Sequence, residues 1–118
     1  MCSLENLSSK RCQPCEGVTK PLTHDQAMKY FNEIREWQIS DDGKIIFRNF
    51  VMKNFSAAIG LIKNIATVAE SENHHPDIHL TGYRKLRIEL TTHAIDGLSE
   101  NDFIVASKIN ALPMELKK

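Results

Sequence analysis

The chain has 118 residues, of which 42% are hydrophobic and 25% charged, and its 15 basic side chains balance 15 acidic ones. This length fits one domain, because two separate cores would each be marginal. Balanced charge without a basic stripe argues against direct binding to nucleic acid. No apolar run approaches the ~18 residues of a membrane span. Because the N-terminal stretch also lacks the apolar core of a secretory signal, we expect a cytoplasmic protein that does not contact membranes.

Three cysteines lie near the N-terminus, at Cys2, Cys12 and Cys15. An odd number is unsuited to a disulfide framework. Cys12 and Cys15 have the spacing of half a zinc site, but structural zinc usually takes four ligands and no second such pair follows. We therefore interpret them as free thiols in an irregular arm over residues 1–21, which is followed by one domain over residues 22–118.

The first predicted element is a helix that begins after Thr23. Thr23 and Gln26 have the spacing of a capping box, in which each side chain satisfies a backbone amide at the helix start. A hairpin follows, because apolar and polar residues alternate on both sides of the Asp42-Gly43 turn signal. The second strand of this hairpin carries Ile46, Arg48, Phe50 and Met52 on one face.

Asn54 is placed to cap a long helix. Seven apolar residues follow the i, i+3, i+4 rule there: Phe55, Ala58, Ile59, Ile62, Ile65, Ala66 and Ala69. Leu61 and Val68 widen this apolar face. A helix that is apolar over more than one stripe is either sandwiched in the core or covered by another subunit, and the small size of the chain is compatible with self-association. Polar substitutions at these two positions are therefore expected to break oligomers.

A second hairpin is predicted after Pro76, with a turn near residues 82–85. Its apolar residues share even parity, which gives one buried face: Ile78, Leu80, Leu86, Ile88 and Leu90. Ser99 to Asp102 repeats the capping-box pattern ahead of a final amphipathic helix. The predicted order is αββαββα. It belongs to the α+β class, with a four-stranded antiparallel sheet and helices packed on one face.

Four of the five histidines lie between residues 74 and 93. Imidazole exchanges protons near neutral pH, so the cluster suggests proton transfer. His74 and His75 end the long helix, and Glu70 is expected to share a helical face with His74 and to orient an imidazole. Hairpin pairing brings His93 back to this region, opposite Pro76 if the turn is at residues 84–85, or opposite Glu70 if it is at residues 81–82.

Strand parity places His93 on the polar face rather than in the core. Imidazoles and a carboxylate without a nearby nucleophile favour reversible proton transfer over covalent catalysis. Two alternatives stay open. The histidines could simply be solvated residues at the ends of elements, or His74, His75 and His93 could bind a metal. Adjacent histidines diverge in an extended chain, which makes joint metal ligation by His74 and His75 awkward.

The spacing of seven residues in this region resembles the signature of the pterin-4a-carbinolamine dehydratase family: Glu70, His74, His75, Pro76, Tyr83, His93 and Asp102. The resemblance extends over about residues 23–112. It implies that water is removed from a 4a-hydroxytetrahydropterin to give the quinonoid dihydropterin, without a metal or an organic cofactor. It also implies recycling of the pterin cofactor of aromatic amino acid hydroxylases.

By this resemblance, His74, His75 and His93 carry catalysis, and the supporting residues are Glu70, Pro76, Thr92 and Asp102. His74 and His93 are assigned as the acid/base pair, whereas His75 holds the substrate. Packing explains Tyr83 equally well, capping explains Asp102, and His79 is expected to be peripheral. The stretch before Tyr83 is one residue longer than in shorter family members, and a bulge at Gly82 is expected to absorb it.

The resemblance also implies a homo-oligomer, either a dimer or a tetramer. Some family members act as dimerisation cofactors of a transcription factor, so a non-catalytic binding module is the alternative function. A metal-binding protein is the third hypothesis. The expected partners are therefore the pterin substrate and further copies of the chain.

Overall fold

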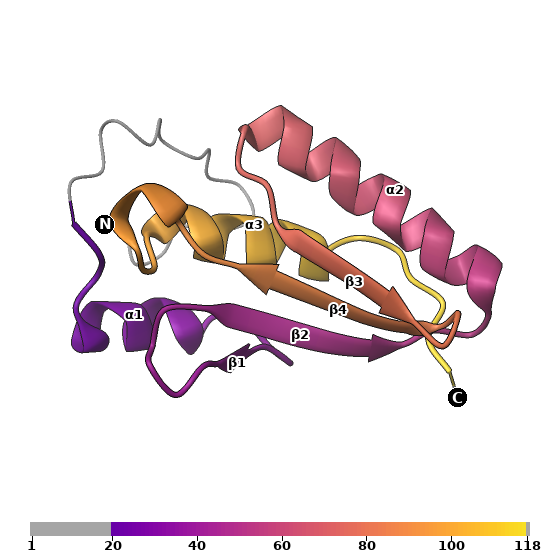
Figure 1. Cartoon of the computed structure of the whole chain (residues 1–118), viewed down its shortest axis with the longest axis horizontal. Helices are drawn as coiled ribbons and strands as arrows, with labels where there is room; N and C mark the ends of the chain where they lie inside the picture. Colours follow the sequence, from indigo (N-terminus) through magenta and orange to yellow (C-terminus); the bar gives the residue numbers. More distant parts are fainter. Residues whose placement is uncertain (1–19, 118) are drawn as a thin grey trace.

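The computed structural model describes residues 20–117 (Figure 1). The elements, in order, are α1 (His24–Phe31), β1 (Gln38–Ile39), β2 (Ile46–Val51), α2 (Phe55–Glu72), β3 (Asp77–Thr81), β4 (Lys85–Leu90), a 3₁₀ helix (His93–Ile95) and α3 (Glu100–Asn110). The predicted order αββαββα is confirmed, with the 3₁₀ helix added. Cys12, Cys15 and most of the predicted arm over residues 1–21 lie outside the described residues.

The four strands form one antiparallel sheet in the order β1-β2-β4-β3. Side chains of β2 and β4 that share one parity are buried: Ile46, Phe50, Leu86, Ile88 and Leu90. They pack with buried residues of all three helices in one core, and Figure 1 shows α3 passing behind the strands. The predicted α+β class is therefore confirmed.

The helix starts follow the predicted capping. The Thr23 hydroxyl accepts from the Gln26 backbone N–H at 3.2 Å, and the Gln26 side chain accepts from the Thr23 N–H at 2.9 Å. At the start of α2, Asn54 Oδ1 accepts from the Ala57 N–H at 2.8 Å. These contacts satisfy backbone amides that have no partner inside a helix.

Arg48 is the polar member of the core-facing positions of β2. Its guanidinium donates to Asn110 Oδ1 at 2.6 Å, and Trp37 Nε1 donates to the same oxygen at 2.8 Å. Partial burial lowers the pKa of Arg48. The amide of Asn110 also donates to the Arg35 carbonyl at 3.0 Å, so Asn110 links the end of α3 both to β2 and to the segment between α1 and β1.

Leu61 belongs to the part of the apolar face of α2 that is sandwiched in the core, one of the two alternatives for this face. The buried stripe of the helix includes Ala58, Leu61, Ile65 and Ala69, and Leu61 is only 2% exposed. Val68 is partly buried against the same core. Phe55, which was predicted to belong to the stripe, is 54% exposed instead. A broad apolar helix does not reveal which part of its face other elements cover.

The second hairpin turns over three residues rather than two. Thr81 pairs with Lys85, so Gly82, Tyr83 and Arg84 form the loop, and Gly82 lies in this turn with φ 53° instead of forming a bulge. Both predicted registers are therefore wrong. Ile78 is 38% exposed because β3 lies at the edge of the sheet. Among the described residues, no helix is long and apolar enough to cross a membrane.

Candidate active site

The end of α2 separates the two adjacent histidines. Asn73 takes a left-handed conformation with φ 53°, and its backbone N–H donates to the carbonyls of Ala69 and Glu70. This residue ends the helix and changes the direction of the chain. His74 is consequently buried with 6% exposure, whereas the His75 side chain is 56% exposed. The expected divergence of the two histidines is confirmed.

His74 is held by the buried carboxylate of Asp102, which lies in the first turn of α3. The Nε2 atom of His74 is 2.6 Å from Asp102 Oδ1. Asp102 Oδ2 accepts from the Thr92 hydroxyl and from the Ser99 backbone N–H, both at 2.9 Å. Asp102 therefore caps α3 and orients His74 at the same time, each task using a different oxygen.

These contacts favour one tautomer of His74. A backbone N–H and a hydroxyl both donate to Oδ2 of Asp102. A carboxylate held in this way accepts through Oδ1 as well, which fits the tautomer of His74 with a proton on Nε2. In the neutral imidazole, Nδ1 is then the basic nitrogen. The pair can thus hold one tautomer and stabilise the imidazolium that forms when Nδ1 takes a proton.

His75 forms a second pair of the same kind at the surface. Its Nε2 atom is 2.5 Å from Glu70 Oε2, and both side chains are mostly exposed. Glu70 thus orients an imidazole as expected, but it is that of His75 rather than that of His74, with which Glu70 was expected to share a helical face. The left-handed Asn73 interrupts the helical phase, so the carboxylate contacts the residue five positions on instead of four.

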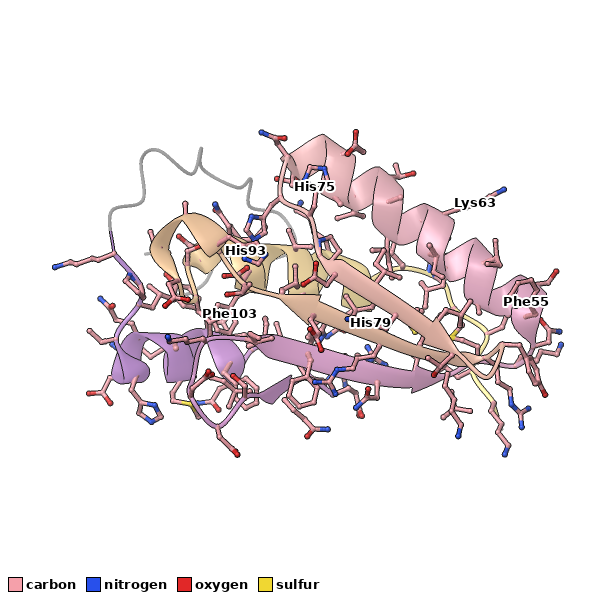
Figure 2. The ribbon with its side chains drawn as sticks, in the orientation of Figure 1. Phe55, Lys63, His75, His79, His93 and Phe103 are labelled. Carbon is pink, nitrogen blue, oxygen red and sulfur yellow. The ribbon has the colours of Figure 1, made fainter. Side chains whose placement is uncertain are left out.

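His93 begins the 3₁₀ helix that follows β4, and its side chain is exposed as predicted. Its neighbour Thr92 is 1% exposed and donates to the carboxylate that holds His74. The chain thus places His93 one residue away from the hydrogen-bond network of His74. In the part of the chain that the structure describes, the His93 ring has no side-chain hydrogen bond. Figure 2 shows His75 and His93 at the same end of the sheet.

Three other residues complete the comparison with the sequence. Pro76 is half-buried between α2 and β3, where it joins the helix to the sheet. Tyr83 is 58% exposed in the β3–β4 turn, at the other end of β4 from His93. His79 lies further along β3, with Nε2 3.7 Å from Glu89 (Figure 2). The structure therefore separates Tyr83 and His79 from the His74 pair.

Ser99 is a member of the site that was interpreted only as a helix cap. Its hydroxyl lies 2.7 Å from the Thr92 hydroxyl, and its backbone N–H binds Asp102. The signal was present in the capping pattern, because residue N3 of a capping box reaches back to the first residue. Within residues 20–117, no group of three or more His, Cys, Asp or Glu side chains is arranged to hold a metal ion.

The fold and site define an α+β domain in which histidine–carboxylate pairs lie where helices meet the sheet. Residues 20–112 match the family model described as pterin 4 alpha carbinolamine dehydratase. The chain belongs to this family. The match agrees with the extent of the resemblance noted in the sequence.

Similar proteins come from plants and bacteria. The chain is 40% identical over 117 residues to "Pterin-4-alpha-carbinolamine dehydratase 2, mitochondrial" from Arabidopsis thaliana, covering 97% of this chain and 63% of the plant protein. A Halorhodospira halophila protein with the same family name is 41% identical, covering 91% of this chain and 97% of its own length. A crystal structure of a "transcriptional coactivator/pterin dehydratase" from Brucella melitensis superposes with a TM-score of 0.73 and 33% identity, covering 78% of this chain and 97% of that protein.

Proposed function

We propose that the chain is a 4a-hydroxytetrahydropterin dehydratase, a lyase that removes water to give the quinonoid dihydropterin. Family membership supports the reaction. The observation that carries the proposal is the buried pair between His74 and Asp102, one hydrogen bond from the residue that precedes His93. This arrangement supplies two imidazoles with different surroundings, as a reaction that needs both an acid and a base requires.

The elimination requires two proton transfers. The departing 4a-hydroxyl must be protonated so that it leaves as water, and the neighbouring ring nitrogen must lose a proton. We assign these steps to His74 and His93. His74 suits the base, because the Asp102 carboxylate stabilises the imidazolium that forms. His93 then serves as the acid, since its exposed ring can regain a proton from water.

The remaining predicted residues take supporting roles. His75 is proposed to hold the pterin, oriented by Glu70. Thr92 supports Asp102 through its hydroxyl, and Pro76 fixes the exit of the chain from the two histidines. Neither a metal nor an organic cofactor is needed for proton transfers of this type.

The direct test is an assay with a 4a-hydroxytetrahydropterin that a hydroxylase generates in the cuvette. Protein purified without a His tag and treated with a chelator should accelerate dehydration over the spontaneous rate. An inactive preparation would contradict the proposal. Activity that disappears on chelation and returns with stoichiometric zinc would favour the metal-binding alternative instead.

A second candidate function is a non-catalytic binding module or dimerisation cofactor. The observation that favours it is the apolar surface of α2, where Phe55 is 54% exposed and Ile59 and Ile62 are only half-buried. We propose that this surface supports a homo-oligomer, either a dimer or a tetramer. Phe55→Ser should reduce the mass measured by light scattering, while dehydration by the variant tells whether catalysis depends on assembly.

We also propose that the chain acts in the cytoplasm. The Halorhodospira relative comes from a bacterium, which agrees with the expected cytoplasmic location, whereas the plant relative is named mitochondrial. Fractionation of cells that express the tagged chain would distinguish these compartments.

A further inference from the structure

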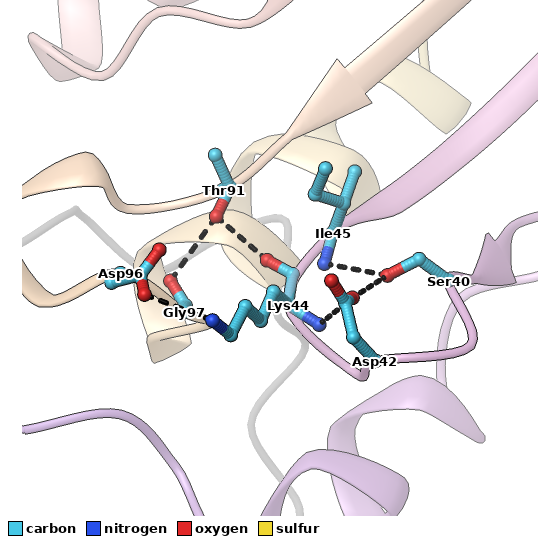
Figure 3. A network of polar contacts seen from close by, with 7 residues as sticks. All are labelled: Ser40, Asp42, Lys44, Ile45, Thr91, Asp96 and Gly97. Atoms are coloured by element: carbon cyan, nitrogen blue, oxygen red, sulfur yellow. Dashed lines mark hydrogen bonds and ion pairs between the residues drawn. The ribbon is translucent and has the colours of Figure 1, made fainter.

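A polar network joins the β1–β2 connection to the turn that begins at His93 (Figure 3). The Thr91 hydroxyl lies 2.6 Å from the backbone carbonyl oxygen of Lys44 and 3.3 Å from that of Gly97. The Lys44 ammonium is 2.9 Å from the Asp96 carboxylate, which raises the pKa of the lysine. Because Asp96 and Gly97 end the turn, these contacts attach it to a separate part of the fold.

The turn itself needs such support. Asp96 has φ 52°, a left-handed conformation that residues other than glycine seldom adopt. Its backbone N–H donates to the His93 carbonyl at 3.2 Å, and the Thr92 N–H donates to the Gly97 carbonyl at 2.9 Å. On the other side, a Cβ atom at Gly97 would lie 2.8 Å from Pro21 Cβ, so Pro21 packs closely against the turn. The Thr91 hydroxyl contacts the same turn from the end of β4, through the Gly97 carbonyl.

We propose that Thr91 is a positioning residue for His93, with its hydroxyl holding the turn against the β1–β2 connection. This inference rests on the proposed function, because it assumes that His93 transfers a proton. Thr91 is half-buried, whereas the Lys44 and Asp96 side chains are 47% and 84% exposed. Exposed ion pairs contribute little, so of the two contacts between the turn and Lys44 we expect the hydroxyl to contribute more than the ion pair.

Movement of the turn would change the distance between His93 and the substrate, and therefore the rate. A proton donor has to lie within hydrogen-bond reach of the substrate, and a misplacement of about 1 Å can cost ~10²-fold in rate. Loss of one fastening among several should move His93 by less than this. We therefore expect about a tenfold decrease in kcat when the Thr91 hydroxyl is removed, with KM changed by less than about twofold, because His75 still holds the substrate.

The test compares three variants with the wild-type chain. Thr91→Val removes the hydroxyl and keeps the shape, whereas Thr91→Ser restores the hydroxyl. Thr67→Val is the matched control, because it removes a hydroxyl that donates to the Lys63 carbonyl at 3.2 Å on the exposed side of α2. The proposal expects a loss of kcat in Thr91→Val, recovery in Thr91→Ser and an unchanged kcat in Thr67→Val. Equal activity of the two valine variants, or a serine variant as slow as Thr91→Val, would overturn it.

Backbone amide exchange measured by NMR separates this proposal from the proposed function. In Thr91→Val, the amides of Asp96 and Gly97 should exchange at least about threefold faster, with recovery in Thr91→Ser, because the turn opens more often. An inactive wild-type chain would refute the dehydratase proposal, and the exchange rates would then decide only whether the Thr91 hydroxyl holds the turn. Unchanged exchange of both amides in Thr91→Val would overturn that role.

Discussion

The Nε2 atom of His74 lies 2.6 Å from Oδ1 of Asp102, and both side chains are buried. The second oxygen of the carboxylate caps α3 through the Ser99 amide. One side chain therefore links the start of α3 to the residue proposed as the base. Removing its charge should affect activity and stability together, for separate reasons.

Asp102→Asn tests this double role. An amide offers one acceptor oxygen and one donor group, so either the Ser99 amide loses its acceptor or His74 has to accept from the amide nitrogen and change its tautomer. We expect kcat/KM to fall by at least about tenfold and the free energy of unfolding to decrease by about 1–3 kcal/mol. Steady-state kinetics and urea unfolding measure the two effects. Asp41→Asn, at an exposed position of the β1–β2 connection, is the control and should change neither. Full activity in Asp102→Asn would contradict the assigned role.

Glu70→Gln should have a milder effect. The pair between Glu70 and His75 is exposed, and such pairs contribute ~0–1 kcal/mol. If His75 holds the substrate, KM should rise by no more than about fivefold, while kcat stays near the wild-type value. A large decrease in kcat without a change in KM would show instead that His75 takes part in proton transfer. Initial-rate measurements over a range of pterin concentrations distinguish these outcomes.

Leu61→Ala and Phe55→Ser test which side of α2 packs in the core. Leu61 is buried, so its truncation should lower the free energy of unfolding by about 2–5 kcal/mol. Phe55 is exposed, so Phe55→Ser should leave the stability of the subunit within about 0.5 kcal/mol of wild type. Urea unfolding of both variants, at a protein concentration low enough to keep the wild type monomeric, gives the comparison. A Leu61→Ala variant whose free energy of unfolding stays close to that of the wild type would contradict the packing of Leu61 in the core.

The pH dependence of stability should contain a contribution from Asp42. The Ser40 hydroxyl and then the Lys44 backbone N–H hold the pKa of Asp42 below its ordinary value of 3.8. Because the folded pKa is the lower one, Asp42 stabilises the fold above about pH 3.8 and loses this contribution as the pH falls through the lowered pKa. Between about pH 5 and about pH 2, Asp42→Asn should therefore lose less stability than the wild type. Parallel unfolding curves for the two proteins would argue against this contribution.

Local patterns predicted most of the fold. The capping residues Thr23 and Asn54 mark real helix starts, and the parity of Leu86, Ile88 and Leu90 gives the buried face of the sheet. These features depend on neighbours in sequence, so periodicity detects them. The buried side of α2 depends instead on contacts with distant elements, so the sequence alone left open whether Leu61 faces the core or another subunit.

The candidate site was predicted as a group of residues but not as a set of contacts. A single left-handed residue, Asn73, changes the partner of Glu70 from His74 to His75. A three-residue turn places the hairpin register between the two alternatives that the sequence allowed. The link from Asp102 to His74 spans 28 residues and exists only because α3 packs beside the end of α2. No local pattern encodes such a contact.

The most direct measurement is the dehydration rate of a 4a-hydroxytetrahydropterin by wild type, His93→Ala and His79→Ala. Both histidines are exposed, so neither change should disturb folding, and His79 serves as the matched control. We predict a loss of ~10²–10⁴-fold in kcat for His93→Ala and a wild-type rate for His79→Ala. Wild-type activity in His93→Ala, or equal losses in both variants, would contradict the claim that His93 transfers a proton in this reaction.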